Sequence, residues 1–266
     1  MNVLKIPLNA GALTKKDGVE LSPDKILEIA KDFNLTENSH LPVYDIDEVK
    51  IDNNNFEGAH KAIYEKVKAT EGFTVLLGGD HSLTYPAFKA FAENNKATGE
   101  SGEPGIIIFD AHPDLENNFE PPTHEDYLRV LIEKGIVKKE NVILVGIRHM
   151  HKNETEFIKA NKIKTFTMKE ISFEGTREIC DSIMSVARQF GALYISIDID
   201  VLDPAFAPGT GYAEPGGLTT RELLYFIHRL KNMKNLKMAD IVEINPKKDL
   251  NDMTSKIGAK ILTELY

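Results

Sequence analysis

The sequence predicts an α/β fold: a single three-layer domain whose mainly parallel sheet of about eight strands has helices on both faces. Three observations support this prediction. Short apolar runs rich in β-branched residues alternate along the chain with stretches of helical periodicity. Single helices between successive strands indicate βαβ units, whose strands are parallel. The 266 residues contain no internal repeat or linker, so residues 1–266 are expected to form one domain.

The elements follow in order from these patterns. The segments with the length and composition of strands are 3–8, 43–51, 73–78, 105–111, 141–148, 163–168, 193–199 and 236–243. The first helix follows Ser22, which can cap it, and Pro23, which suits its first turn. The stretches with helical spacing or a helix start are 26–33, 59–67, 127–132, 220–224 and 251–253. The polar segment 94–104 is the best candidate for a surface loop.

Composition narrows the function classes. The net charge of −9 argues against nucleic-acid or anionic-membrane partners and is compatible with a cationic substrate. The lone Cys180 excludes an intrachain disulfide and a cysteine-based zinc site. The start of the chain lacks the apolar core of a signal peptide, and no segment approaches a membrane span of about 18 residues. We therefore expect a cytoplasmic protein.

Acidic residues and histidines directly follow the apolar runs 73–77, 105–109 and 193–197 of three predicted strands. The segments that carry them are 78–82, 110–114 and 198–204. In parallel α/β sheets ligands bind at the carboxyl ends of the strands, so the three segments are expected to meet there. Carboxylates that meet repel one another, and burying each costs several kcal/mol. A divalent cation resolves that conflict, and the pattern therefore predicts a metal site.

The spacing within these segments supports the same interpretation. Asp110, His112 and Asp114 are two residues apart, as are Asp198 and Asp200, so each set lies on one face of extended backbone. A single aspartate after a strand is most simply a cap or turn residue. The combined pattern instead favours ligation.

The ligand types indicate which metal. Aspartates with a minority of imidazoles suit Mn²⁺ or Mg²⁺ better than structural zinc. A single catalytic metal that keeps an open position needs fewer ligands than the sequence offers. A pair of ions about 3.5 Å apart, bridged by carboxylates, accommodates all of the candidate ligands. The six predicted ligands are His81, Asp110, His112, Asp114, Asp198 and Asp200.

At this point the chain resembles the ureohydrolases, the family of arginases, agmatinases and formimidoylglutamases. Its three signatures occur here in the family's order: Gly-Gly-Asp-His-Ser at 78–82, Asp-Ala-His-x-Asp at 110–114 and Ser-x-Asp-x-Asp-x-x-Asp-Pro at 196–204. Nearly the whole chain shares the resemblance, because further similar segments lie at 18–23, 208–211, 214–219 and 242–246.

The resemblance implies an arginase-like fold and two Mn²⁺ ions per subunit. One ion would be surrounded by His81, Asp110, Asp114 and Asp198. The other would be surrounded by Asp110, His112, Asp198 and Asp200. In this arrangement Asp110 and Asp198 bridge the two ions.

The resemblance also implies catalytic roles. Glu243 matches the carboxylate that holds the substrate's guanidinium, since a carboxylate accepts two parallel hydrogen bonds from a planar cation. His124 matches a proton-shuttling histidine, and Asp114 counts among the catalytic residues as well as the ligands.

Two alternatives stay open for the histidines. His124 precedes Glu125 where the family has glycine, and the segment 123–126 also fits a helix start capped by Thr123. His149 and His151 follow a predicted strand and either reach the mouth of the site or lie in an exposed loop.

The loop after the second motif bears on the substrate. Glu116 and Asn117 are predicted to bind it. This loop is acidic, with Glu120 and Glu125 further along, and it lacks the serine through which arginases typically read a carboxylate. Carboxylates repel an anionic tail and attract a cationic one. Agmatine is therefore slightly preferred to arginine, although Asn117 or Asn118 could still contact a carboxylate.

The sequence thus predicts a manganese-dependent hydrolase that releases urea and an amine from a small cationic guanidino substrate, of agmatinase type. The alternatives are an arginase, a formimidoylglutamase or another guanidino-acid hydrolase. A further alternative is an inactive metal-binding relative that serves as a regulatory subunit. The retained ligands and Glu243 favour the enzyme. By resemblance the protein is expected to be a homo-oligomer, a trimer or hexamer.

Overall fold

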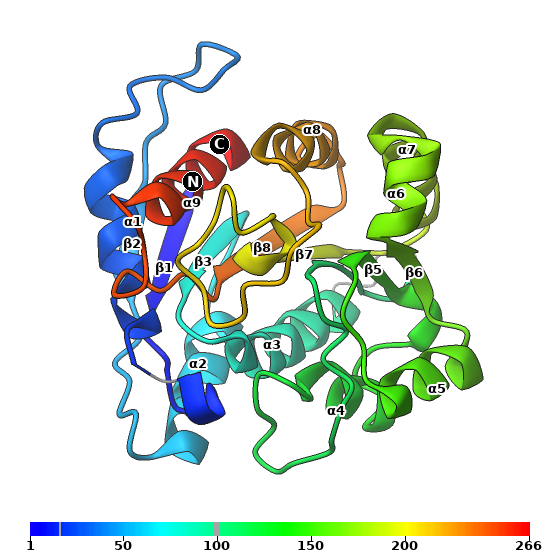
Figure 1. The fold of residues 1–266 in the computed structure, drawn as a ribbon. Helices are drawn as coiled ribbons and strands as arrows, with labels where there is room; N and C mark the ends of the chain where they lie inside the picture. Colours follow the sequence, from blue (N-terminus) through cyan, green and yellow to red (C-terminus); the bar gives the residue numbers. More distant parts are fainter. Residues whose placement is uncertain (16, 98–101) are drawn as a thin grey trace.

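A single sheet of eight parallel strands forms the middle of the molecule (Figure 1). The structure is a computed structural model that describes residues 1–15, 17–97 and 102–266. The sheet order is β2-β1-β3-β8-β7-β4-β5-β6. The strands are β1 (Asn2–Ile6), β2 (Asp45–Glu48), β3 (Thr74–Gly78), β4 (Gly105–Phe109), β5 (Val142–Ile147), β6 (Lys164–Thr167), β7 (Leu193–Asp198) and β8 (Leu236–Val242). Each falls on a predicted segment, so the predicted sheet is confirmed.

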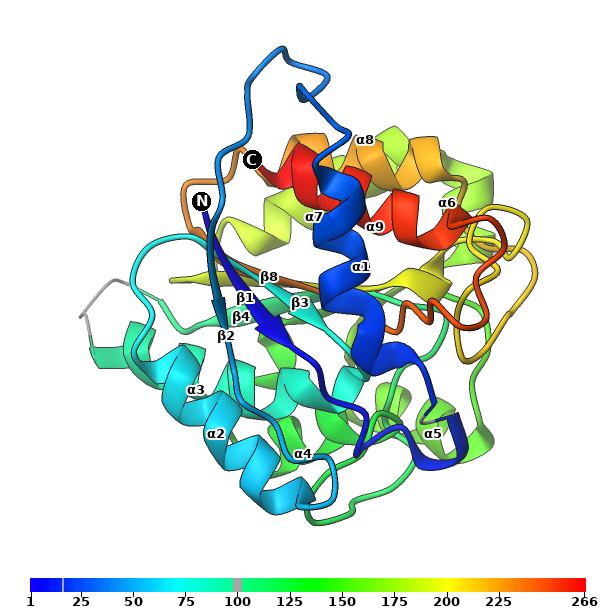
Figure 2. The same ribbon diagram turned by 90° about the vertical axis from the view of Figure 1, so that its left-hand side faces the viewer.

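Helices cover both faces of this sheet (Figure 2). The helices α1 and α6 to α9 lie on one face, and α2 to α5 lie on the other. They are α1 (Ser22–Ala30), α2 (Phe56–Lys68), α3 (Thr84–Ala97), α4 (Tyr127–Glu133), α5 (Lys152–Asn161), α6 (Met168–Glu174), α7 (Thr176–Ala187), α8 (Thr220–Leu230) and α9 (Met253–Leu265). None of the helices in the described ranges is long and apolar enough to cross a membrane. The three-layer α/β prediction is confirmed.

The central strands are buried on both faces, which explains their continuous apolar sequences. In β4, Ile107 and Phe109 join the core beneath α1 and α6 to α9, whereas Ile106 and Ile108 join the core beneath α2 to α4. Alternate side chains of one strand thus stabilise both layers, by about 1.5–3 kcal/mol for each large apolar side chain. The sheet is a rigid support for the loops at its carboxyl edge.

Two local predictions differ from the structure. Ser22 does not cap α1, because the 3-10 helix 19–21 runs directly into α1 and Ser22 already has helical backbone angles. Its hydroxyl is buried without a hydrogen-bond partner. The predicted loop 94–104 begins too early, because residues 94–97 form the last turn of α3. Residues 98–101 lie outside the described residues.

The strand order brings the chemically important segments together. The adjacent strands β3, β8, β7, β4 and β5 lie at the centre of the sheet. Residues near the carboxyl ends of β3, β8, β7 and β4 are in register: Leu77 pairs with Ile241, Ile241 with Ile197, and Ile197 with Phe109. The residues that follow each strand therefore emerge side by side at one edge.

Candidate functional site

The loop after β3 delivers His81 to the site in a constrained conformation. Gly79 lies so close to the backbone of Leu8 that a Cβ atom would be 1.8 Å from its carbonyl oxygen. Asp80 then caps the 3-10 turn 81–83 by accepting a hydrogen bond from the backbone N–H of Ser82. Only glycine fits the first position, and the cap directs the next side chain inward.

Buried hydroxyl groups orient the His81 ring. Its Nε2 lies 2.8 Å from Ser196 Oγ and 2.9 Å from the hydroxyl of Tyr127. Ser196 in turn donates a hydrogen bond to the buried Asp240 carboxylate at 2.7 Å. Such partners fix the direction of a ligating imidazole. The other ring nitrogen, Nδ1, is left to face the carboxylates at the sheet edge.

Three carboxylate oxygens surround that nitrogen. His81 Nδ1 lies 3.2 Å from Asp110 Oδ2, 3.2 Å from Asp114 Oδ2 and 3.1 Å from Asp198 Oδ2. None of these contacts has the geometry of a hydrogen bond, and His81 Nδ1 and Asp110 Oδ2 are buried without a hydrogen-bond partner. Two ligands that each lie about 2.0–2.2 Å from one ion are separated by about 3 Å. The unpartnered atoms and their separations therefore fit a cation.

A second group shares Asp110 with the first. His112 Nδ1 lies 3.0 Å from Asp200 Oδ2 and 3.5 Å from Asp110 Oδ1. The backbone helps to hold both carboxylates, because Ala111 N–H donates to Asp200 and His112 N–H donates to Asp110. His81, Asp110 and Asp198 form one set of donor atoms that could hold an ion, and Asp110, His112 and Asp200 form another.

The electrostatics of the cluster also favour bound cations. Burial, followed by repulsion from neighbouring carboxylates, raises the pKa of Asp114 and of Asp198 well above the ordinary aspartate value. Burial and Asp110 likewise raise the pKa of Asp200. Asp114 also has a positive φ of 53°, an uncommon conformation for a residue with a side chain. So many buried carboxylates need positive charge, and divalent ions would supply it.

Glu243 and His124 form a pair beside the ligand cluster. Glu243 follows β8 with a φ of 61°, and its Oε1 accepts a hydrogen bond from His81 N–H at 2.9 Å. His124 Nδ1 lies 3.1 Å from the same oxygen. Burial opposes the charged imidazole, but the Glu243 carboxylate outweighs it and raises the pKa of His124 to about 9. His124 is therefore neither a surface residue nor part of α4, which begins at Tyr127.

A pocket of about 200 Å³ opens onto this pair and the ligands. Four of the predicted ligands and both members of the pair line it, and its rim is formed by Glu116, Glu125, His149, His151, Glu154, Tyr212 and Glu214. Asn117 is not among the described residues that line the pocket. Glu120 lies away from it and forms an ion pair with Lys134 at 2.7 Å.

The rim carboxylates differ in their partners. Glu125 accepts a hydrogen bond from the Tyr212 hydroxyl at 2.8 Å, and Glu154 accepts from the backbone N–H groups of Leu115 and His151. The carboxylate of Glu116, in contrast, makes no hydrogen bond or ion pair with any described residue. It is the rim acid that a ligand can use without displacing a partner.

The sequence does not single out Glu214 or Tyr127 as site residues. Glu214 lies in a family-like segment, and the structure places its Oε1 3.3 Å from His149 Nδ1. Tyr127 lies in a stretch of helical spacing, and its hydroxyl contacts His81. The contact between Tyr127 and His81 could have been suspected from the sequence, because a tyrosine hydroxyl in an otherwise apolar helix stripe needs a polar partner when it is buried.

Comparison with known proteins agrees with these observations. The family model described as "Arginase family" matches residues 1–266. An arginase from Staphylococcus aureus (strain COL) is 30% identical over 286 residues, which covers 95% of this chain and 92% of the relative. A formimidoylglutamase structure from Bacillus subtilis superimposes with a TM-score of 0.91 at 26% identity, covering 99% of this chain and 85% of that one. A structure described as a hypothetical agmatinase from Burkholderia thailandensis superimposes with a TM-score of 0.87 at 27% identity, covering 99% and 84%. The chain belongs to the arginase family.

Proposed function

We propose that the chain is a manganese-dependent hydrolase that cleaves a guanidino C–N bond to release urea and an amine, with agmatine as the preferred type of substrate. Three relatives carry three different activity names, so family membership alone does not select a substrate. The observation that carries the proposal is the assembled pocket, in which the ligand cluster, the Glu243–His124 pair and the free carboxylate of Glu116 face one space.

The two sets of donor atoms would hold two Mn²⁺ ions. In this proposal the residues around them are His81, Asp110, His112, Asp114, Asp198 and Asp200, with Asp110 and Asp198 as bridges. Oxygen donors with two imidazoles suit Mn²⁺. When bound, the ions supply Lewis-acid activation of water for attack on the guanidinium carbon.

Glu243 is suited to hold the guanidinium. The residue is 4% exposed and lines the pocket. Burial opposes its charge, but His124 and the His81 N–H outweigh burial and lower the pKa of Glu243 below the ordinary value. It is therefore ionised at neutral pH. An ionised carboxylate fixed in this way can accept two parallel hydrogen bonds from a planar cation.

His124 is suited to give a proton to the leaving amine. Its Nε2 is buried without a hydrogen-bond partner, and the residue lines the pocket. With a pKa of about 9 the imidazole carries a proton at neutral pH. The protonated ring thus has a free N–H group beside the bound substrate, as a general acid requires.

A His124→Ala variant should therefore lower kcat by roughly 10²–10⁴-fold while its manganese content stays that of the wild type. Urea release and elemental analysis on the same sample measure both quantities. His40→Ala, which changes an exposed histidine that does not line the pocket, is the matched control. An unchanged kcat would assign His124 a purely structural role and make His149 and His151 the next candidates.

Glu116 supports a cationic tail on the substrate. Its carboxylate makes no hydrogen bond or ion pair with any residue in the described ranges. The chain's net charge of −9 also provides no compensating attraction for an anion. A primary ammonium group, as in agmatine, would pair with it. The carboxylate of arginine would instead approach like charge.

Comparing kcat/KM for agmatine and arginine tests this preference. We expect agmatine to be favoured by at least tenfold, or about 1.4 kcal/mol in the transition state. Glu116→Gln should reduce that advantage, whereas Glu120→Gln should preserve it because Glu120 lies away from the pocket and pairs with Lys134. A tenfold advantage for arginine would overturn the substrate assignment and leave the hydrolase assignment intact.

One observation favours a second candidate, a guanidino-acid or formimidoyl-acid substrate. His149 and His151 both line the rim, and His149 is 46% exposed. Imidazoles can donate hydrogen bonds to a substrate carboxylate. If arginine or a formimidoyl substrate is turned over faster than agmatine, these two side chains become the proposed carboxylate-binding residues.

Three expectations from the sequence remain predictions: a single catalytic domain over residues 1–266, a homo-oligomeric trimer or hexamer, and a cytoplasmic location. An inactive regulatory role is disfavoured because four of the six proposed ligands line one pocket together with Glu243 and His124. Urea release from any guanidine in a small panel would exclude it.

A further inference from the structure

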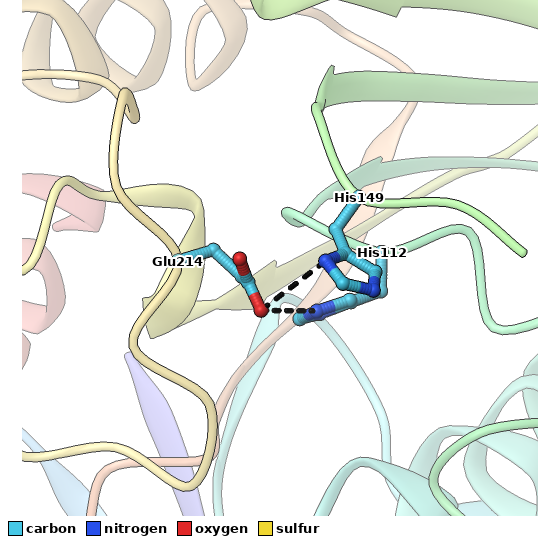
Figure 3. A group of neighbouring side chains, drawn as sticks. All are labelled: His112, His149 and Glu214. Atoms are coloured by element: carbon cyan, nitrogen blue, oxygen red, sulfur yellow. Dashed lines mark ion pairs between the residues drawn. The ribbon is translucent and has the colours of Figure 1, made fainter.

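A further cluster of donor atoms lies at the mouth of the pocket and shares His112 with the ligand sets described above. It consists of His112, His149 and Glu214, each of which offers one ligand atom within 4.8 Å of those of the other two. Glu214 Oε1 is 3.3 Å from His149 Nδ1 and 3.9 Å from His112 Nε2. Figure 3 shows one carboxylate oxygen facing both imidazoles, with the three residues coming from three different segments.

The backbone around the cluster is firmly held. The N–H groups of Arg148 and His149 both donate to the carbonyl oxygen of Ala111, which precedes His112. The Arg148 guanidinium donates to the carbonyl oxygen of Glu214 at 2.7 Å and to that of Asp200 at 2.6 Å. One arginine thus joins the segments that carry all three side chains. The fold therefore fixes the backbone positions of the three residues relative to one another.

The donor set differs in kind from the cluster deeper in the pocket. Two imidazoles and one carboxylate, with a position left open to solvent, are the ligands of many catalytic zinc sites. The deeper cluster is dominated by carboxylates, which suit Mn²⁺. His149 is 46% exposed, so an ion can reach the cluster directly from solution.

We propose that His112, His149 and Glu214 form a third metal site, selective for Zn²⁺ over Mn²⁺, at the mouth of the pocket. His112 would contribute Nε2, because its Nδ1 faces Asp200 and Asp110. With Nδ1 on a manganese ion, Nε2 carries the ring's proton, so His112 would bind Zn²⁺ as an imidazolate: the incoming ion would replace the Nε2 proton, which passes to solvent. Because all three side chains line or adjoin the pocket, an ion held there narrows the substrate's entrance.

The site therefore makes Zn²⁺ an inhibitor that acts without displacing Mn²⁺. This distinguishes it from simple metal exchange in the deeper cluster, where gain of zinc would equal loss of manganese. The proposal does not depend on which guanidine is the substrate, since metal content is measured without turnover.

The test is to load the protein with Mn²⁺, equilibrate it with a buffered series of free Zn²⁺ concentrations and count both metals per chain. Wild type should take up one Zn²⁺ more than His149→Ala at equal manganese content. Glu214→Gln should weaken this uptake roughly 10–100-fold or more, since even residues outside the direct ligand set change metal affinity by that much. His151→Ala is the matched control, because His151 lines the same rim but is not one of the three donors.

Two further results bear on the proposal. Co²⁺ added to manganese-loaded wild type should produce absorption from a low-coordinate cobalt site that His149→Ala lacks. Equal zinc uptake by wild type, His149→Ala and Glu214→Gln would overturn the proposal. So would zinc uptake matched by manganese loss in all of them. Both counts remain informative if no guanidine is hydrolysed, so failure here is separable from failure of the proposed function.

Discussion

Replacing Asp110 with asparagine is expected to remove bound manganese and urea release together, with a loss of activity on the order of 10³-fold or more. Asp110 is the residue shared by both sets of donor atoms. Its two oxygens face His81 Nδ1 at 3.2 Å and His112 Nδ1 at 3.5 Å. Asparagine removes the charge and places an N–H donor where an ion needs a lone pair. Both metal positions therefore lose a ligand through one substitution.

Elemental analysis and urea assays on the same purified sample measure this effect. Asp181→Asn is the matched control, because Asp181 is 46% exposed on α7 and pairs with Arg229 at the surface. In the wild type, a chelator should abolish activity and added Mn²⁺ should restore it. Two retained Mn²⁺ ions and ordinary turnover in Asp110→Asn would contradict the assigned ligand set, as would full activity in metal-free protein.

Glu243→Gln is expected to lower kcat/KM for guanidines by roughly 10²–10⁴-fold while manganese content is unchanged. The substitution keeps the side chain's size and leaves an oxygen to accept from His81 N–H and His124, so the local structure should persist. What is lost is the negative charge opposite the guanidinium. Removing one partner of a buried hydrogen-bonded charge pair costs 2–5 kcal/mol or more.

Steady-state kinetics with agmatine and arginine measure the change, and both substrates should be affected alike because they share the guanidinium. Glu156→Gln, at a position 66% exposed on α5, is the matched control. A kcat/KM within threefold of the wild type would remove Glu243 from the proposed binding site. A loss confined to one substrate would instead indicate that Glu243 contacts the variable tail.

The sequence by itself determined the architecture and the metal-type residues. Apolar strands followed by acidic residues are a local pattern, and the parallel arrangement that βαβ units impose brings such strand ends to one edge. The positions of His81 and Asp110 after β3 and β4, and of Asp198 at the end of β7, follow from this rule alone. Ser22 shows where prediction from a local pattern fails. The preceding 3-10 turn runs directly into α1, so this residue is not a helix cap.

Only the tertiary structure decided which loop side chains face the pocket. Glu116 and Glu120 look equivalent along the chain, yet Glu116 lines the pocket and Glu120 pairs with Lys134 at the surface. His149 meets Glu214 across 65 positions of sequence because Arg148 joins their backbones. The direction of a loop side chain depends on contacts between distant segments, and these contacts cannot be predicted from residue spacing. Strand ends obey a local rule of geometry, whereas loops are positioned by the packing of the whole chain.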